Sequence, residues 1–310
     1  MNRRIIEKIL CGIHARFVES IKDEHTRKLV SKYSIITGGS IVSLLLNERV
    51  SDFDYYFTNK ETVLAVTNYY VHEFNRLNPK TLIMPQIAEQ DDRVRIMIKS
   101  AGIAGEGADD NYQYFERLPD KVGENWLDKV MSADEIPAEL LNEVGETEEK
   151  EKYRPVFLSD NAITLSDKIQ LVIRFYGDPE EIHENYDFAH CKNYWTAATG
   201  KLTLDPLAIE SILTKNMVYQ GSLYPVCSVI RMRKFLKAGW HINAGQILKM
   251  LFQVSQLDLT NVTVLEDQLT GVDAAYFHQI IDYCKARQEK DPEFKVTMPY
   301  LLTIIDRIFG

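Results

Sequence analysis

A glycine pair followed by two closely spaced aspartates is the feature that most constrains how this chain of 310 residues folds. Gly38 and Gly39 end an apolar stretch, and Asp52 lies 13 residues after the second glycine. The apolar segment from Ile41 to Leu46 predicts a short helix between them. Because Asp54 lies among alternating aromatic residues, we expect the order strand, glycine turn, helix and strand.

The two aspartates form a candidate cation site. Alternate side chains of a strand point to opposite faces, so Asp52 and Asp54 share one face. The other face carries Phe53, Tyr55 and Phe57, which we expect to pack in the core. Mg²⁺ prefers hard oxygen ligands. Two carboxylates that face one cation therefore predict a magnesium site.

The glycine turn is a candidate phosphate site. Gly38 and Gly39 permit a tight turn and let backbone N–H groups approach phosphate oxygens. Ser40 occupies the position of a helix N-cap, and the N-terminus of the following helix is the positive end of its dipole. The segment predicts a phosphate cradle next to a metal site.

This arrangement resembles the signature of the nucleotidyltransferase superfamily, which includes DNA polymerase β, poly(A) polymerases and CCA-adding enzymes. The spacing is most similar to the CCA-adding and bacterial poly(A) polymerase branch, and the region from Ile163 to Trp195 is similar in character to phage and large-virus members. The resemblance implies that Gly39 and Ser40 contact a nucleoside triphosphate and that Asp52 and Asp54 bind two Mg²⁺ ions. One difference is that Val42-Ser43 stands where the CCA-adding pattern carries Arg-Asp.

The resemblance also implies a third carboxylate on a neighbouring strand. Asp187 is the candidate, because Tyr186 and Phe188 flank it in the alternating manner of a strand that enters a core. Asp160 and Asp167 are the competing choices.

The pattern along the chain predicts an α+β fold. A catalytic domain is expected over residues 1–200, with a mixed sheet flanked by helices and an insertion near 100–155. The acidic stretch from Asp134 to Glu151 reads as a solvated linker. An all-α domain is expected over residues 201–310, because the later segments have helical periodicity separated by proline and glycine.

Hydrophobic periodicity places further elements around the motif. A helix is expected within residues 2–32 and another from Lys60 to Leu77, with strands from Thr81 to Pro85 and from Arg93 to Lys99. The later helices are expected near residues 205–217, 225–239, 243–256, 262–287 and 294–309.

A basic segment lies within the predicted helical domain. Between Ser228 and Met250 there are five Lys or Arg residues and no acid. Arg231 and Lys234 of this segment are candidates to hold a triphosphate tail or an RNA backbone. The other interpretation is a solvated helix face whose neighbouring acids come from elsewhere in the fold.

Composition excludes several other classes. A formal net charge of −9 argues against a surface that binds nucleic acid everywhere, because such binding depends on phosphate neutralisation by Lys and Arg. The four cysteines form no Cys-x-x-Cys pair, so neither a zinc site nor a disulfide framework is expected. Charges interrupt the apolar residues of the N-terminus, and no apolar run approaches about 18 residues. We therefore expect a cytoplasmic protein with no membrane segment.

Together these features predict a magnesium-dependent nucleotidyltransferase that moves a nucleoside monophosphate from a triphosphate such as ATP to an acceptor hydroxyl. The all-α half and the basic segment favour RNA, such as a tRNA-like end, as the acceptor, whereas the acidic balance of the chain favours the alternatives. Two alternatives remain open. One is a transferase of the same fold that modifies a protein or small molecule, and the other is a catalytically silent relative that acts by binding.

Overall fold

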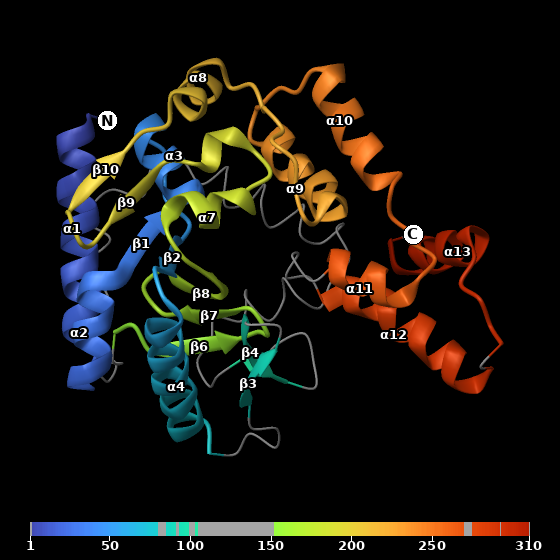
Figure 1. Cartoon of the computed structure of the whole chain (residues 1–310), viewed down its shortest axis with the longest axis horizontal. Helices are drawn as coiled ribbons and strands as arrows, with labels where there is room; N and C mark the ends of the chain where they lie inside the picture. The colour runs from blue at the N-terminus through green and yellow to red at the C-terminus, as the bar shows by residue number, and fades with distance from the viewer. Residues whose placement is uncertain are drawn as a thin grey trace, which may run out of the picture. The chain divides into compact units, whose positions relative to one another are not determined.

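The computed structural model describes residues 2–79, 85–90, 93–98, 103–104, 152–269, 275–291 and 293–309. The chain divides into two compact units, one made of Met1–Gly107 and Tyr153–Leu257 and the other of Ala108–Lys152 and Asp258–Gly310. The first unit combines a sheet with helices and the described part of the second is helical, which confirms the predicted α+β class (Figure 1). The domain boundary predicted at residue 200 differs from this division and stays a prediction.

A mixed sheet forms the centre of the first unit. Its eight strands follow the order β10-β9-β1-β2-β8-β7-β6-β5 in the described part of the chain. Strands β2 and β8 are parallel, and the other neighbouring pairs are antiparallel. The strands are β1 (Ser34–Thr37), β2 (Phe53–Phe57), β5 (Ile103–Ala104), β6 (Pro155–Leu158), β7 (Ala162–Leu165), β8 (Ile169–Tyr176), β9 (Tyr194–Thr196) and β10 (Lys201–Thr203).

The two faces of β2 have different environments. Tyr55 and Phe57 are fully buried in a cluster that also includes Phe17 and Phe74. Phe17 belongs to α1 (Arg3–Ser20) and Phe74 to α4 (Lys60–Leu77). Helix α2 (Glu24–Tyr33) also contributes to this cluster. Asp54, on the opposite face, is only half-buried. The predicted alternation of this strand is confirmed by its burial pattern.

The elements before and after β2 agree with the sequence to different degrees. The helix predicted within residues 2–32 is two helices, because Asp23 caps α2 by accepting the Thr26 N–H at 2.7 Å. Helix α4 has the predicted bounds. The predicted strand at Thr81–Pro85 lies almost wholly outside the described residues. A two-stranded hairpin follows it, made of β3 (Gln86–Gln90) and β4 (Arg93–Met97).

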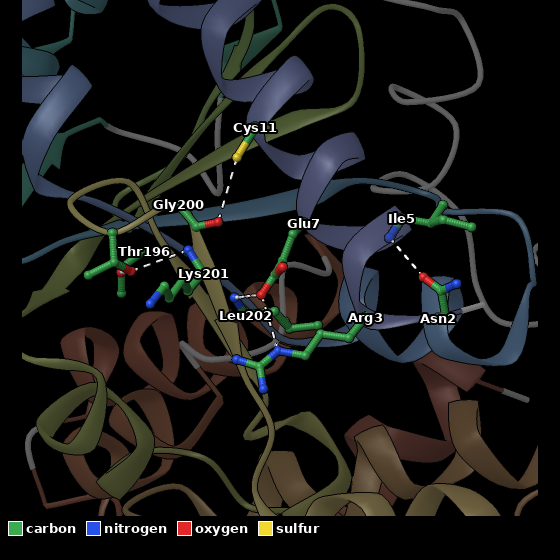
Figure 2. Close-up of polar contacts among 10 residues, drawn as sticks. Asn2, Arg3, Ile5, Glu7, Cys11, Thr196, Gly200, Lys201 and Leu202 are labelled. Atoms are coloured by element: carbon green, nitrogen blue, oxygen red, sulfur yellow. Dashed lines mark hydrogen bonds and ion pairs between the residues drawn. The ribbon is translucent and has the colours of Figure 1, made fainter.

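Helix α1 is joined by polar contacts to the edge of the sheet formed by β9 and β10 (Figure 2). Glu7 Oε1 accepts the Leu202 N–H at 3.0 Å and Arg3 Nε at 3.1 Å. The Cys11 thiol lies 3.7 Å from the Gly200 carbonyl oxygen. The hydrogen bond from the Leu202 N–H holds the pKa of Glu7 below its ordinary value. These contacts fix the first helix against β10, the edge strand of the sheet, and the turn that precedes it.

After β10 the regular elements of the described chain are helices, and from Asp205 onward the sequence predicts helices. In the first unit the helices after β8 are α7 (Pro179–Glu184), the short 3₁₀ helix η2 (Ala189–Cys191), α8 (Pro206–Thr214), α9 (Pro225–Lys237) and α10 (Ala244–Val254). The second unit holds α11 (Val262–Leu269), α12 (Ala275–Lys290) and α13 (Met298–Phe309). The predicted insertion near 100–155 and its acidic linker lie almost entirely outside the described residues. Among the described helices, none is both long and apolar enough to cross a membrane.

Candidate functional site

The glycine turn and Asp54 lie directly against each other. Thr37, the last residue of β1, is paired with Asp54 of β2, and Gly38 follows with φ of 83°. A Cβ atom built on Gly38 would lie 3.1 Å from Asp54 Oδ2 and 3.6 Å from the Tyr186 hydroxyl. The missing side chain at Gly38 thus makes room for the Asp54 carboxylate.

The helix after the turn begins earlier than predicted. Helix α3 (Gly39–Leu46) has Gly38 as its N-cap, without a side-chain hydrogen bond. The prediction of Ser40 as N-cap is therefore wrong, because the positive φ of Gly38 ends the strand and lets Gly39 open the helix. Ser40 lies in the first turn, and its buried Oγ has no hydrogen-bond partner among the described residues. Gly39 is exposed, and a Cβ atom there would meet nothing within 4 Å.

Asp52 precedes the first residue of β2 and is half-buried. The Ser51 hydroxyl donates a hydrogen bond of 2.6 Å to its Oδ1. Lys168, at the start of β8, lies close by and donates to the Val50 carbonyl at 3.0 Å. Burial and then Arg49 lower the pKa of Lys168, while Asp52 acts in the opposite direction. Asp52 is therefore a half-exposed carboxylate with a lysine near it.

Asp187 lies in a bend between α7 and η2, not in a strand. The predicted strand is wrong because three alternating residues are too few to distinguish a strand from a bend packed by its aromatic neighbours. Its carboxylate accepts Arg231 Nη1 at 2.6 Å, and its carbonyl accepts the Gln220 N–H at 2.8 Å. The structure thus joins two predicted site residues to each other as an ion pair.

The strand beside Asp54 carries an amide, not a carboxylate. In the parallel pairing of β2 and β8, Asp54 is in register with Gln170. The competing candidate Asp167 lies in the β7–β8 turn, where it accepts the Tyr153 N–H at 3.1 Å. Asp160 lies in the bend between β6 and β7. Hence neither alternative is placed on the strand next to Asp54.

Cys191 connects the turn with the region of Asp187. Its carbonyl accepts the Gly38 N–H at 3.2 Å. Burial, and next the Asp187 charge, raise the pKa of its thiol to about 12, while Lys234 and Arg231 act to lower it. Asp54 also raises this pKa. The charges of Asp54 and Asp187 and of the two predicted basic residues therefore all act on the Cys191 thiol.

Two tyrosines outside the glycine and aspartate motif lie beside Asp54. Tyr56 and Tyr186 are joined by a side-chain hydrogen bond, and burial followed by the Asp54 charge raises the pKa of Tyr56 far above its ordinary value. The sequence suggests Tyr56 through its place on the strand face of Asp54. For Tyr186 and Cys191 it gives no signal, because both reach the turn through tertiary contacts.

A buried hydrogen bond joins Thr37, the residue before the turn, to His183 of α7. Thr37 Oγ1 and His183 Nε2 are 2.8 Å apart, and the same hydroxyl donates to the Asn193 carbonyl at 2.9 Å. The His183 ring also lies 4.9 Å from the Tyr186 ring, measured between centroids. Helix α7 is thereby fixed next to the last residue of β1.

The turn gives a direct prediction for stability. Gly38→Ala should lower the free energy of unfolding by about 1–3 kcal/mol, because a side chain at positive φ is strained and its Cβ would lie 3.1 Å from Asp54 Oδ2. Gly39→Ala is the matched control, and we expect no loss and a gain of up to about 1 kcal/mol, since alanine is favoured in a helix. Urea unfolding of both variants measures this. Equal midpoints for the two would contradict the assigned turn geometry.

Asp54 and Asp52 are the carboxylates available to a magnesium ion. Mg²⁺ in nucleotide sites is usually held by one or two carboxylates, waters and substrate phosphates. Asp54 offers a carboxylate beside the glycine turn, and Asp52 precedes it by two residues. In the described part of the chain, no group of three or more His, Cys, Asp or Glu side chains is arranged to hold a metal ion. The predicted count of two ions stays a prediction.

Solved structures of CCA-adding enzymes are similar to this chain. The Thermotoga maritima enzyme complexed with tRNA has a TM-score of 0.37 and 10% identity, and the match covers 92% of this chain and 57% of that one. The Bacillus stearothermophilus enzyme in complex with CTP has a TM-score of 0.37 and 11% identity, and the match covers 84% and 48% of the two chains.

Sequence comparison points to a phage family. A curated relative, Gabija anti-defense 2 of Bacillus phage SPbetaL7, is 20% identical over 131 residues, which are 42% of this chain and 32% of that protein. The match thus spans about a third of that relative's length. The sequence model of the Gabija anti-defense 2 family matches residues 11–215, which include the glycine turn, Asp52, Asp54 and Asp187. Since this match extends over about two thirds of the sequence, the chain belongs to the Gabija anti-defense 2 family.

Proposed function

We propose that this chain is a magnesium-dependent nucleotidyltransferase that counters Gabija defense, the role that its family name states. The observation that supports it best is the contact between the phosphate turn and a carboxylate, with a Gly38 Cβ position 3.1 Å from Asp54 Oδ2. Nucleotidyl transfer needs both a phosphate cradle and carboxylates at one place. In this proposal β1, α3 and β2 of the first unit provide both.

The residues of the turn would bind and orient a nucleoside triphosphate. The first N–H groups of a helix lack intrahelical partners and favour anions, and exposed Gly39 leaves space above those of α3. Asp52 and Asp54 would hold the magnesium ion, which when bound supplies charge neutralisation and polarises phosphate oxygens. Burial keeps the nearby phenol of Tyr56 protonated, so it remains a hydrogen-bond donor beside the carboxylate.

The proposed acceptor is RNA, and the support for it is a basic residue of helix α9. Lys234 is exposed on α9 and lies within electrostatic reach of the site through Cys191. A net charge of −9 limits favourable phosphate contacts to such a basic surface.

The amide of Gln170 beside Asp54 favours a second candidate function. In this alternative the chain binds a nucleotide without transferring it and opposes the defense system by binding. An assay that follows label from the triphosphate separates the two functions, because binding without transfer leaves the acceptor unlabelled.

Labelling identifies both the reaction and the acceptor. The full chain is incubated with each α-labelled triphosphate, Mg²⁺ and either total RNA or a protein extract, and the macromolecule that acquires label is identified. We expect label in RNA. Label in protein would replace the proposed acceptor, and triphosphate-induced thermal stabilisation without label would support the binding alternative.

An infection experiment tests the link to defense. Cells that carry a Gabija system are infected with a sensitive phage while they express either the native chain or a double variant, Asp52→Asn with Asp54→Asn. We expect the native chain to restore plaque formation and the double variant to fail. Restoration by both proteins, at matched expression, would show that the defense is countered without nucleotidyl transfer.

A further inference from the structure

The side chain of Thr37, the last residue of β1, is surrounded by polar groups. It is fully buried, and its Oγ1 lies 2.9 Å from the Asn193 carbonyl oxygen and 3.3 Å from the Cys191 carbonyl oxygen. Its third neighbour is His183 Nε2, at 2.8 Å. A hydroxyl has one proton to donate, and a carbonyl oxygen can only accept. The Thr37 hydroxyl therefore donates to a carbonyl and accepts a hydrogen bond from His183.

This arrangement determines which nitrogen of the His183 ring carries the proton. Burial lowers the pKa of His183 to about 4, so the ring is neutral at pH 7 and has a single N–H group. That group is Nε2–H, because the Thr37 hydroxyl has already given its own proton to a carbonyl. The hydrogen bonds thus run in one direction, from His183 through Thr37 to Asn193.

The same hydrogen bonds hold the start of the glycine turn. Gly38 follows Thr37 directly, and its N–H donates to the Cys191 carbonyl at 3.2 Å. Two successive residues, Thr37 through its side chain and Gly38 through its backbone, are thus bonded to the segment between η2 and β9. A displacement of the Thr37 side chain would therefore also displace the first residue of the turn.

His183 also contacts a phenol that reaches the turn. Its ring lies 4.9 Å from the Tyr186 ring, measured between centroids. The Tyr186 hydroxyl is 3.6 Å from the Cβ position of Gly38, and Asp54 Oδ2 is 3.1 Å from that same position. One buried imidazole therefore contacts the residue before the turn and a side chain that lies beside the turn and the carboxylate.

We propose that His183 is a positioning residue of the nucleotide site, which donates Nε2–H to Thr37 and so holds the glycine turn in the orientation that receives a triphosphate. It acts through Thr37 and touches neither the triphosphate nor the magnesium ion. A turn that adopts the competent orientation only part of the time binds its ligand more weakly in the same proportion. This inference rests on the proposed function, because it assumes that a triphosphate binds at the turn.

The ring proton of His183 is observable by NMR without any ligand. At pH 7, long-range ¹H–¹⁵N correlation spectra of the full chain distinguish the Nε2–H from the Nδ1–H tautomer, and the His183 signals are those missing from His183→Gln. We expect the native ring in the Nε2–H form and a mixture of both tautomers in Thr37→Val, which removes the acceptor. The Nδ1–H form in the native chain would overturn the inference.

Triphosphate affinity measures the positioning itself. Calorimetry follows binding of a triphosphate whose α,β-bridge is methylene to the full chain in the presence of Mg²⁺. We expect His183→Phe, which keeps an aromatic ring but has no N–H, to weaken binding by about 3- to 10-fold, the effect of losing one neutral hydrogen bond. His183→Gln retains an N–H donor on its side-chain amide and should recover most of the affinity. Native affinity in His183→Phe would contradict the assigned role.

His14→Phe is the matched control. His14 is also buried, and burial also lowers its pKa to about 4. Its ring packs against Tyr55 and Trp195, in the apolar cluster on the other face of β2 from Asp54. We expect this variant to change the affinity by less than about 2-fold. A loss as large as that of His183→Phe would show that replacing any buried histidine weakens binding, and would overturn the inference.

A double-mutant cycle separates positioning from a general loss of stability. If His183 acts through the Thr37 hydroxyl, Thr37→Val combined with His183→Phe should bind the analogue about as weakly as Thr37→Val alone. Losses that multiply would overturn the inference. Thr37→Ser keeps the hydroxyl and should bind more tightly than Thr37→Val, a comparison that holds even if His183→Phe does not fold.

The native chain distinguishes this inference from the proposed function. Failure of the native chain to bind the analogue would remove the proposed function itself. Tight native binding together with unchanged affinity in His183→Phe would remove only the role of His183.

Discussion

Asp54→Asn should abolish transfer of label from the triphosphate, by a factor of about 10³ or more, while the fold is retained. An amide cannot provide the negative charge that holds a magnesium ion against the phosphates, and the stabilisation lost is worth several kcal/mol. The carboxylate is half-buried at the rim of the sheet and outside the apolar cluster, so the melting temperature should move by only a few degrees. Initial rates of label incorporation and thermal unfolding measure the two effects.

Glu19→Gln is the matched control, because it removes one exposed acid that is not among the proposed site residues. We expect it to label the acceptor at the native rate. Wild-type rates in Asp54→Asn would show that the reaction is not carried by this carboxylate. A large drop in melting temperature would instead show that Asp54 stabilises the turn, and activity loss would then be a consequence of misfolding.

Acidification should destabilise the first unit strongly between pH 6.5 and pH 4. Burial lowers the pKa of His14, His183 and His190 to about 4, from an ordinary value of 6.5. Within this window the unfolded chain binds more protons than the folded chain, so stability falls as the pH falls. Each shift corresponds to about 3 kcal/mol at its full extent, a large fraction of a stability of about 5–15 kcal/mol. Urea midpoints at pH 7, 6 and 5 measure the slope.

His190 offers the sharpest test of this pH dependence. Its ring lies 4.5 Å from the Phe235 ring and 4.2 Å from the Trp240 ring, measured between centroids, and neither of its nitrogens has a hydrogen-bond partner among the described residues. His190→Phe should therefore fit the same space and flatten the dependence by about one proton equivalent. A slope identical to that of the native chain would show that His190 does not cause acid destabilisation.

Local patterns predicted the elements whose signals are contained in a single segment. The bounds of α4, the alternation of β2 and the adjacency of the glycine turn to Asp54 all follow from periodicity within a few tens of residues. The prediction of Ser40 as the N-cap was wrong because the helix start depends on the positive φ of Gly38. A pair of glycines in a sequence does not show which of the two adopts that conformation.

Long-range contacts account for what sequence reasoning missed. The parallel pairing that puts Gln170 beside Asp54 joins β2 and β8, two strands that lie far apart in the sequence. Asp187 and Arg231 are 44 residues apart in sequence, and each was assigned to the site without any sign that they bind each other. Such pairs depend on tertiary packing, which hydrophobic periodicity does not encode.

The hydrogen bond between the Gly38 N–H and the Cys191 carbonyl has a consequence for the direction from which an anion arrives. This N–H group is already used, so its side of the loop is closed to incoming oxygens. The donors that remain are those of the first helical turn, above the open flank of Gly39. A phosphate bound at this turn, as proposed, would therefore accept from the N–H groups that open α3, while the Gly38 N–H would keep the loop fixed through Cys191.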